Sequence, residues 1–488
     1  MQQLNILLIN KHTISMTNLH LIKQIILINL ISLLLLISLT TPSFATPYGI
    51  ITKDQAQTTQ INNIMALIDK KEYKKAFTQL EQINNLDMCL IRFNLNKFNE
   101  LLKEYKNILL SEANNHTEQG DYVFALNLLN SKAKYYKNDE NINALIKYNS
   151  NQIKNKNLVE YNGEIEHLFT HCLLAYPEAA LNPKNPLSAD FDRDCLTPTE
   201  FEKILASLYS KNYVLVDIES IYETINGIAK RKPLYLPAGK KPLIFSFDDC
   251  NYDSKKENKG MVDKIILDRN GNIATYTSKK SIADRVSYNN EFVTILENFV
   301  KTYPDFSHNG AKGVICLTGY DGVLGYRTQK SNATSRFEIK KAQEVISKLK
   351  KLGWKFACHS YGHYHMKNIS DMEFSKELYN WQNEVEPLIG KTDIYVYPYG
   401  EWQITDENGN ICYKHKLLLD SGFNLFCGVG AKTFFNYMPL GTTETHTLFM
   451  DRKPIDGQTL RNFSNYYDHL FNCEEVYDHT VRTVPFHT

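Results

Sequence analysis

Two neighbouring carboxylates are the first candidates for chemistry in this sequence. Asp248 and Asp249 end a run of apolar and β-type residues that begins at Ile244. Such a run, followed by a polar break, predicts a buried strand and its carboxyl end, where the catalytic groups of α/β barrels gather. Buried acids are costly unless a metal or proton chemistry uses them. From these residues alone, an Asp pair that caps the next element is an equally open interpretation.

Two histidines form the second group that could do chemistry. His359 and His363 follow Lys355–Cys358, which reads as another buried strand. A turn of helix at this point would place both imidazoles on one side. Neutral imidazole is the commonest nitrogen ligand of divalent transition metals. With one carboxylate, the pair gives a two-His, one-carboxylate set that leaves positions open for water and substrate.

Two further motifs follow strand-like runs in the second half of the chain. YVYPYG (residues 395–400) predicts a strand that breaks at Pro398, and LLLDSGFNLF (residues 417–426) predicts a helix, an Asp-x-Gly turn and a strand. With the Asp pair and the His-Ser-x-x-His motif they form an ordered set. Over roughly residues 160–470 the chain resembles the polysaccharide deacetylase family, also called carbohydrate esterase family four or the chitooligosaccharide deacetylase homology domain.

The resemblance implies a fold and a division of roles. The fold would be a distorted (β/α) barrel of seven or eight strands. Asp249, His359 and His363 would bind a divalent metal, usually zinc, and Asp248 would be the general base. The backbone N–H of Tyr399 would stabilise the oxyanion that forms from the substrate carbonyl. Ser360 is expected to be a local turn group rather than a nucleophile, because a metal-activated water removes the need for one.

The sequence departs from the family pattern at several positions. Cys250 stands where the family usually has Gly, and Tyr395 stands where it has an Arg that pairs with the catalytic Asp. Asp420 matches the acid of the Asp-x-Gly turn, which in the family orients a late catalytic His. No Leu-x-His motif is evident near the C-terminus. We therefore expect Arg452 to line the site or replace the missing Arg, and His446 to be the weaker candidate for the general acid.

The chemistry of amide hydrolysis agrees with this assignment. An N-acetyl amide is a poor electrophile, so its hydrolysis benefits from a metal that polarises the carbonyl and activates water, and from a base that takes the proton of that water. The expected function is hydrolysis of N-acetyl groups on a cell-wall or extracellular polysaccharide. Removal of O-acetyl esters at the same site stays open, as does a catalytically weak glycan-binding or scaffold protein.

The N-terminus has the features of an export signal. An apolar run, Ile25–Leu39, follows Lys11, His12 and Lys23, and the residues TPSFA follow it at 41–45. This order predicts a secretory signal peptide cleaved after Ala45. The run is short for a membrane span, which needs about 20 residues, but an uncleaved anchor at residues 1–45 stays open. Either alternative places the rest of the chain outside the cytoplasm, as a secreted, periplasmic or cell-surface protein, with membrane contact only if the segment is uncleaved.

Residues 46–158 are expected to form a separate helical module. Two segments, KKEYKKAFTQLEQ and QGDYVFALNLLNS, share a Tyr-x-x-Ala pattern typical of tetratricopeptide-type helical hairpins. Their tyrosines, Tyr73 and Tyr122, are 49 residues apart, so a regular array with a period of about 34 is doubtful. The module would dock a protein partner or the glycan polymer, or serve as a plain helical stalk.

Residues 159–488 are expected to form the barrel, with a hairpin region inserted at 251–290. Asn270-Gly271 between two β-type runs is the signal for that hairpin. His167 and His171 are four apart, which would suit a metal on a helix, but the alternating pattern around them favours a strand. Positions four apart on a strand share a face and lie about 13 Å from each other.

Composition and cysteine spacing exclude other classes. The 488 residues carry 55 basic and 54 acidic side chains, so no basic excess indicates a nucleic-acid partner. None of the nine cysteines forms a CxxC pair, so a zinc ribbon is not expected. One or two disulfides in an oxidising compartment stay open.

Overall fold

The structure is a computed structural model that describes residues 53–83, 93–225, 227–440 and 445–486. The signal peptide or anchor expected at residues 1–45 lies outside the described residues. No helix in the described ranges has both the length and the apolar character that crossing a membrane requires. The chain divides into two compact units between Leu109 and Leu110. The boundary expected at residues 158 and 159 stays a prediction.

The first unit is helical. It contains α2 (Lys53–Asp69), α3 (Tyr73–Glu81) and the first part of α5 (Leu95–Glu118). Ala76 and Phe77 of the first predicted repeat segment are fully buried, and the ring of Phe77 stacks on Tyr105 with centroids 3.6 Å apart. The small Ala allows α3 to approach its neighbours closely. The helical character of this segment is therefore confirmed, while its likeness to tetratricopeptide repeats stays a prediction.

The second unit begins with the end of α5 and a helical pair. Helix α6 (Tyr122–Lys132) packs along α7 (Glu140–Asn155). Ala125 and Leu129 of the second predicted repeat segment are buried. Asp139 caps α7 by accepting hydrogen bonds from the backbone N–H groups of Asn141 and Ile142.

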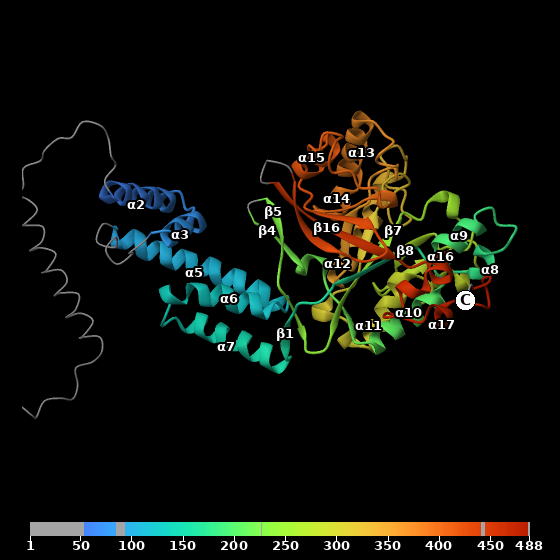
Figure 1. Cartoon of the computed structure of the whole chain (residues 1–488), viewed down its shortest axis with the longest axis horizontal. Helices are drawn as coiled ribbons and strands as arrows, with labels where there is room; N and C mark the ends of the chain where they lie inside the picture. Colours follow the sequence, from blue (N-terminus) through green and yellow to red (C-terminus); the bar gives the residue numbers. More distant parts are fainter. Residues whose placement is uncertain (1–52, 84–92, 226, 441–444, 487–488) are drawn as a thin grey trace, which may run out of the picture. The chain divides into compact units, whose positions relative to one another are not determined.

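The rest of the second unit is built on a closed barrel of seven parallel strands (Figure 1). Around the barrel these are β7 (Lys241–Asp248), β11 (Val314–Leu317), β12 (Lys355–Cys358), β13 (Ile394–Val396), β14 (Leu425–Val429), β16 (Thr445–Pro454) and β2 (Glu166–His171). Strand β2 pairs with β16 on one side and with β7 on the other, which closes the ring. The predicted (β/α) barrel is confirmed, with seven strands.

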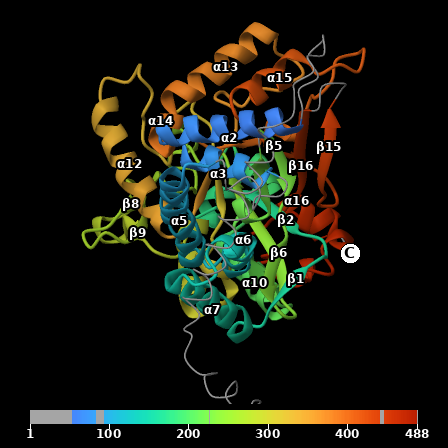
Figure 2. The same cartoon turned by 90° about the vertical axis from the view of Figure 1, so that its left-hand side faces the viewer.

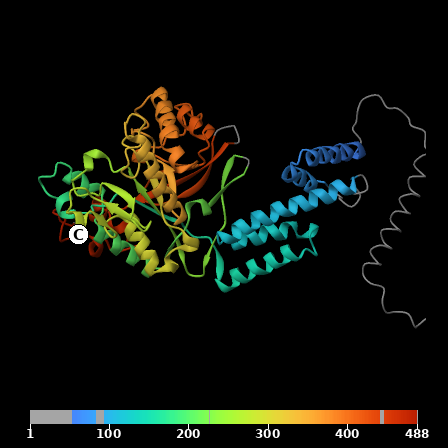
Figure 3. The same ribbon diagram turned by 180° about the vertical axis from the view of Figure 1, so that it is seen from behind.

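Amphipathic helices cover the outside of the barrel (Figures 1 and 3). The longer ones are α10 (Pro198–Ser210), α11 (Phe292–Thr302), α12 (Ser335–Lys351), α13 (Asp371–Glu384) and α15 (Tyr413–Asp420). Shorter ones are α8 (Pro177–Ala180), α9 (Ser188–Asp194), α14 (Glu386–Ile389), α16 (Gly457–Asn462) and α17 (Cys473–Val476). Helix α10 begins with a capping box formed by Thr197 and Glu200. The buried faces of these helices and the outward residues of the strands form one apolar core.

The two-residue period of the strands decides which side chains enter the barrel. In β7, Phe245 and Phe247 point outward, and the ring of Phe247 stacks on Phe292 of α11 with centroids 3.9 Å apart. Ile244 belongs instead to a second core, which fills the barrel. Because side chains alternate along a strand, Ser246 and Asp248 share the inward face with Ile244. This alternation puts the carboxylate of Asp248 inside the mouth of the barrel.

Additional strands pair with the edges of the barrel strands or form small separate sheets. Strand β15 (Phe435–Leu440) runs antiparallel beside β16 (Figure 2), and β3 (Tyr213–Leu215) pairs with the first residues of β7. Two small sheets pair β1 (Leu158–Tyr161) with β6 (Leu234–Pro237) and β4 (Tyr222–Ile225) with β5 (Ile228–Arg231). A hairpin forms within the predicted insertion, with β8 (Lys264–Leu267) and β9 (Ile273–Tyr276) joined by a turn that Asp268 stabilises, and β10 (Val286–Ser287) beside β9.

The cysteines belong to the core. The eight cysteines in the described ranges are all buried and free, and Cys89 lies outside those ranges. The thiol of Cys250 donates to the carbonyl oxygens of Phe247 and Asp248 at 3.2 and 3.7 Å. Cys250 therefore contacts the backbone that leads into the Asp pair.

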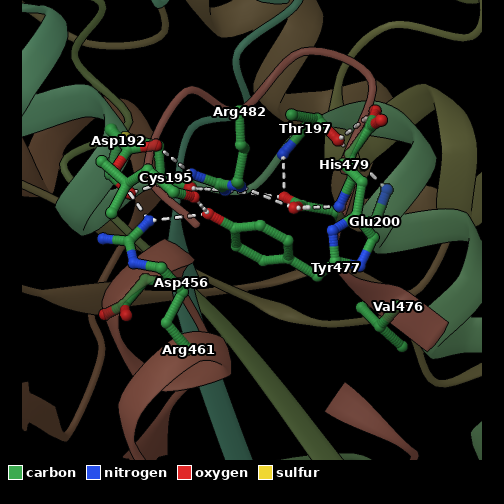
Figure 4. A network of polar contacts seen from close by, with 12 residues as sticks. Asp192, Cys195, Thr197, Glu200, Asp456, Arg461, Val476, Tyr477, His479 and Arg482 are labelled. Atoms are coloured by element: carbon green, nitrogen blue, oxygen red, sulfur yellow. Dashed lines mark hydrogen bonds and ion pairs between the residues drawn. The ribbon is translucent and has the colours of Figure 1, made fainter. Parts of the chain in front are cut away.

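A buried ionic network fixes the C-terminal segment to the barrel (Figure 4). Arg482 donates to both carboxylate oxygens of Glu200 at 2.6 and 2.7 Å and to Asp192 at 3.1 Å. Arg461 donates to the other oxygen of Asp192 at 2.7 Å. The Arg482 side chain also donates to the carbonyl oxygen of Cys195 at 2.7 Å. These bonds satisfy charges that burial would otherwise make costly.

We expect Arg482→Met to destabilise the protein by about 3–5 kcal/mol, because Glu200 and Asp192 would stay buried without their partner. Thermal unfolding of the full chain measures this effect. Arg193→Met is the matched control, because Arg193 is half exposed where it pairs with Asp190 and Asp194. Its effect should stay within about 0.5 kcal/mol. Equal effects of the two substitutions would contradict the structural role of the network.

Candidate active site and metal centre

The candidate site lies at the carboxyl ends of three barrel strands. Asp248 is the last residue of β7 and Asp249 is the next residue, while His359 follows β12 directly. Tyr399 lies in η9 (Pro398–Gly400), a short turn after β13. Because the strands are parallel, their carboxyl ends meet at one end of the barrel. The fold therefore brings together groups that are about a hundred residues apart in the sequence.

Asp249, His359 and His363 form a group with the geometry of a metal site. Their ligand atoms all lie within 4.8 Å of one another. Nε2 of His363 is 3.8 Å from Oδ1 of Asp249, and the two imidazole centroids are 4.9 Å apart. A divalent ion bound by nitrogen and oxygen ligands at about 2.0–2.2 Å would fit among atoms at such separations.

Three observations test whether these residues fit a metal. Nδ1 of His359 lies 2.9 Å from the carbonyl oxygen of Val396, which requires the hydrogen on Nδ1 and leaves the Nε2 lone pair free. Burial lowers the pKa of His363 to about 4, so its imidazole is neutral at pH 7. Among the described residues, the buried Oδ1 of Asp249 has no hydrogen-bond partner. The donor set therefore fits a divalent transition metal.

The charge around Asp249 also depends on a lysine that sequence reasoning missed. Burial alone would raise the pKa of Asp249, but the charges of His363, Lys256 and His359 lower it. Lys256 ends the short helix η5 (Ser254–Lys256) and pairs with Asp253 at 3.2 Å. No sequence pattern indicated that Lys256 acts at the site, because it belongs to the inserted region, and only the folded chain brings that region close to Asp249.

The segment between the two histidines is a loop and not the predicted turn of helix. Ser360 and His363 have φ values of 58° and 55°, which a right-handed helix excludes. The hydroxyl of Ser360 accepts a hydrogen bond from the backbone N–H of His363 at 3.0 Å. The backbone N–H of Gly362 donates to the carboxylate of Glu377 on α13. These bonds hold the loop, and Ser360 has the local turn geometry that was expected.

Left-handed backbone conformations gather at this site. Asp249, Ser360, His363 and Tyr399 all have φ between 55° and 58°. Such conformations cost energy in residues other than glycine and persist where the surrounding structure enforces them, often at functional sites. The backbone geometry is therefore a second feature, besides the side chains, that marks this end of the barrel.

Arg452 and Asp248 form a buried ion pair beside the metal group. Nη1 and Nη2 of Arg452 donate to Oδ1 and Oδ2 of Asp248 at 2.8 and 2.9 Å. Arg452 also donates to the hydroxyl of Ser246 and to the carbonyl oxygen of Gly428, each at 3.2 Å. Burial alone would raise the pKa of Asp248, but the charges of Arg452 and His359 and the hydrogen bonds from Arg452 hold it well below its usual range. Asp248 is therefore an ionised carboxylate.

Arg452 makes the ion pair with Asp248 that the resemblance assigns to an Arg at position 395. Arg452 belongs to β16, where it shares the inward face with Leu448 and Met450. Tyr395 points outward from β13 into the core, and its ring lies 5.4 Å from that of Phe423. Position 452 of β16 therefore faces the barrel interior, whereas position 395 of β13 faces away from it. An Arg at position 395 would point away from the barrel interior.

Tyr399 lies at the outer side of the metal group. Its ring stacks on His365 with centroids 3.7 Å apart and contacts the ring of His363 at 4.6 Å. The side chain of Tyr399 is exposed. The turn after β13 therefore places the Tyr399 backbone next to one of the two histidines.

His171 also lies at this end of the barrel. It is the last residue of β2, which is the strand that the alternating pattern predicted, and its partner in the register is Asp248. Its Nδ1 is 2.9 Å from the carbonyl oxygen of Asp194. His167 lies deeper, with Nε2 at 2.6 Å from the hydroxyl of Ser246. The two-residue alternation of apolar residues in the sequence indicated that His167 and His171 lie on a strand. Only the strand order of the folded barrel shows that this strand, β2, is the neighbour of β7.

The structure does not bring Asp420 and His446 to this group. Asp420 is the last residue of α15 and leads into the amino end of β14, and its side chain is 61% exposed and pairs with Lys416 at 3.2 Å. His446 is the second residue of β16, ahead of Leu448, which pairs with the first residue of β14. Both positions are at the amino ends of parallel strands, whereas the candidate site lies at their carboxyl ends. The side chain of His446 lies outside the described part of the structure.

We expect Asp420→Asn to leave acetate release within about 2-fold of the unsubstituted protein and its stability within about 0.5 kcal/mol, as for other exposed positions. Kinetics of acetate release and thermal unfolding of the full chain test this. A loss of 10-fold or more would show that Asp420 acts in the site despite its place in the fold.

The comparisons with known proteins identify part of the chain. Residues 301–410 match the family model described as polysaccharide deacetylase. The chain carries a polysaccharide deacetylase domain. This domain is that of hydrolases acting on amide bonds, and the matched residues include His359, His363 and Tyr399. Asp248 and Asp249 lie upstream of the matched segment, at the carboxyl end of β7 in the same barrel.

Solved structures with weak likeness include a deacetylase of Streptococcus pyogenes in complex with acetate. It is 13% identical with a TM-score of 0.33, and the alignment covers 62% of this chain and 94% of that one. A Bacillus anthracis protein assigned to the polysaccharide deacetylases is 12% identical with a TM-score of 0.35, and the alignment covers 65% and 68% of the two chains. Because both TM-scores are below 0.5, these two structures support no conclusion about the function of this chain. No curated protein sequence matches the chain.

Proposed function

We propose that the protein is a metal-dependent deacetylase that hydrolyses N-acetyl groups of a cell-wall or extracellular polysaccharide. One observation carries this proposal. The Asp249, His359 and His363 group and the Asp248–Arg452 pair lie side by side at the mouth of a barrel that contains a polysaccharide deacetylase domain. Hydrolysis of an amide needs an ionised base and a metal with free coordination positions, and an Asp carboxylate beside three metal ligands would provide both.

The residues would hold a divalent metal, with zinc as the first expectation. When bound, such an ion supplies Lewis acidity to the amide carbonyl and lowers the pKa of water. The two neutral imidazoles and one carboxylate would leave positions for water and for the substrate oxygen. Val396 would fix the His359 ring through its carbonyl oxygen, which is the kind of outer hydrogen bond that orients metal ligands.

The remaining residues would direct protons and charge. Asp248 would take the proton of the attacking water, because Arg452 keeps it ionised and fixes both of its oxygens. The backbone N–H of Tyr399 would donate to the developing oxyanion. Without the bidentate contact the Asp248 carboxylate could rotate, so Arg452 acts as a positioning residue for the base.

Exposed tyrosines around the site support a sugar polymer as substrate. Tyr364 and Tyr399 are 53% and 54% exposed, and Tyr320, whose hydroxyl donates to Asp253 at 3.4 Å, is 37% exposed. Aromatic rings at a surface offer flat apolar faces with a polar edge, which suits stacking on sugar rings. The polymer would be outside the cytoplasm if the segment at residues 1–45 is an export signal.

Acetate release by the purified full-length protein tests the proposal. Chitooligosaccharides, peptidoglycan and poly-N-acetylglucosamine are compared with an O-acetylated sugar, each with zinc and after metal removal. We expect acetate from at least one N-acetylated polymer, lost on chelation and restored by the metal. Faster release from the ester would favour the esterase alternative. Sugar binding without acetate release in the metal-loaded protein would favour the glycan-binding or scaffold alternative.

A further inference from the structure

A cation that the proposed function does not use lies beside the metal group. Lys256 is the last residue of η5, in the inserted region after β7. Burial alone would lower the pKa of Lys256, but the charges of Asp249 and Asp253 raise it above its usual range. Of these two charges, that of Asp249 has the larger effect. Lys256 is therefore a charged ammonium close to a carboxylate that we assign to the metal.

The contacts of the Lys256 ammonium leave donors for a ligand. Nζ pairs with Oδ2 of Asp253 at 3.2 Å, and it makes no other ion pair in the described part of the chain. A lysine ammonium has three N–H donors. The side chain of Lys256 is 25% exposed, whereas that of Asp253 is 5% exposed. A molecule at the mouth of the barrel can therefore reach the ammonium, while its carboxylate partner is buried.

Hydrogen bonds from a neighbouring loop fix the segment that carries Lys256. The loop follows β11, the strand next to β7. Its Asp321 accepts a hydrogen bond from the backbone N–H of Ser254 at 2.6 Å. Nη2 of Arg327 donates to the carbonyl oxygen of Tyr252 at 2.9 Å. A charged group that is held in place before binding loses less freedom when a ligand arrives, which favours its use in recognition.

The charges at the site favour an anionic ligand. The ion pairs Asp248–Arg452 and Asp253–Lys256 are each neutral as a pair. A divalent ion held by one carboxylate, Asp249, would add a net positive charge beside them. An anion on the substrate would be attracted by this charge and could accept hydrogen bonds from the ammonium of Lys256. Such complementary charge gives a site its specificity.

We propose that Lys256 selects the substrate by binding an anionic group, a carboxylate or a phosphate, that the polysaccharide carries near its N-acetyl group. This assignment rests on the proposed deacetylase function and names the substrate class, an acidic N-acetylated polysaccharide. Tyr320 is exposed, and its hydroxyl donates to Asp253, so its ring is placed to contact the same sugar. No covalent bond of the substrate changes at Lys256.

Three oligomers of equal length test the proposal: a chitooligosaccharide, its O-carboxymethyl derivative and its O-phosphoryl derivative. We expect the zinc-loaded, full-length protein to favour at least one anionic oligomer by about 10-fold or more in kcat/KM, and the carboxymethyl and phosphoryl forms show which anion it takes. Lys256→Met should lower kcat/KM for that oligomer by about 10–100-fold, mainly through KM, because a charge-assisted hydrogen bond is lost.

The same substitution should change hydrolysis of the neutral oligomer by less than about 3-fold, because no anion is bound there. Lys256→Arg should keep the preference for the anionic oligomer, since the charge remains. Lys255→Met is the matched control, because it removes the same charge from the adjacent, exposed position. It should leave all three rates within about 3-fold.

A double variant separates recognition from structural support. Lys256→Met leaves Asp253 buried without its partner, so Lys256→Met with Asp253→Asn removes both charges. The double variant should fold, keep its zinc and lack the preference for the anionic oligomer. Loss of zinc, or equal losses on neutral and anionic oligomers, would overturn the proposal and make Lys256 a support for Asp249. Equal kcat/KM of the unsubstituted protein for all three oligomers would also overturn it.

Calorimetry distinguishes failure of this inference from failure of the proposed function. If the unsubstituted, zinc-loaded protein releases no acetate from any oligomer, the proposed function fails. Binding of the carboxymethyl and phosphoryl oligomers to the same protein then still tests the anion site. Binding that Lys256→Met weakens by about 10-fold or more would support the site. Binding that is equal in the two proteins would remove it.

Discussion

Replacing Asp249 by Asn is expected to abolish both metal binding and acetate release, with a loss of more than about 100-fold in rate. The substitution removes the one anionic ligand and leaves two neutral imidazoles, which bind a divalent cation much more weakly. His363→Ala should have the same consequence, because Nε2 of His363 lies 3.8 Å from Oδ1 of Asp249 in the same group. Metal content after dialysis and the rate of acetate release are the two measurements.

Asp248→Asn separates the two neighbouring carboxylates. Asp248 faces Arg452 inside the barrel and would act as base, so its amide variant should keep the metal and lose about 10²–10⁴-fold in rate. Asp420→Asn, at the far end of the barrel, controls for the change in charge. If Asp249→Asn and His363→Ala retained metal and acetate release, the metal centre would be in a different place. If only Asp248→Asn lost the metal, Asp248 would be the metal ligand and Asp249 would be the base.

Replacing Arg452 by Met is expected to cost about 3–5 kcal/mol of folding stability and most of the activity. The guanidinium is 1% exposed and makes four hydrogen bonds inside the barrel, two of them to Asp248. Its removal leaves a buried carboxylate without its main partner, which is more costly than the pair was favourable. Thermal or denaturant unfolding measures the stability, and acetate release measures the activity.

A double variant shows whether this cost comes from the unpaired charge. Adding Asp248→Asn to Arg452→Met removes the carboxylate charge, so stability should recover by at least about half while activity stays lost. Arg269→Met, in the exposed turn of the β8–β9 hairpin, is the matched control and should change stability by less than about 0.5 kcal/mol. Stability of Arg452→Met equal to that of the control would contradict the buried pair. A double variant as unstable as Arg452→Met would assign the cost to lost packing.

Local sequence was sufficient wherever the physical cause is local. The strand that ends in Asp248, the strand before His359, the β2 strand around His167 and the capping box at Thr197 all follow from patterns within a few residues. The prediction of a helical turn between His359 and His363 was wrong, because the spacing of the two histidines does not reveal the left-handed conformations of Ser360 and His363. Contacts from Gly362 to Glu377 and from Ser360 to His363 decide that loop.

The sequence by itself predicted the barrel class, which the structure confirms, and the candidate metal group with its two adjacent acids, because each depends on short motifs at strand ends. Only the tertiary structure decided which distant residues meet them. Asp248 and Arg452 are 204 residues apart in the chain, and His171 reaches Asp248 because β2 closes the barrel against β7. In the same topology, Asp420 and His446 lie at the amino ends of the strands. Strand order and register are set by closure of the whole barrel, which no local pattern specifies.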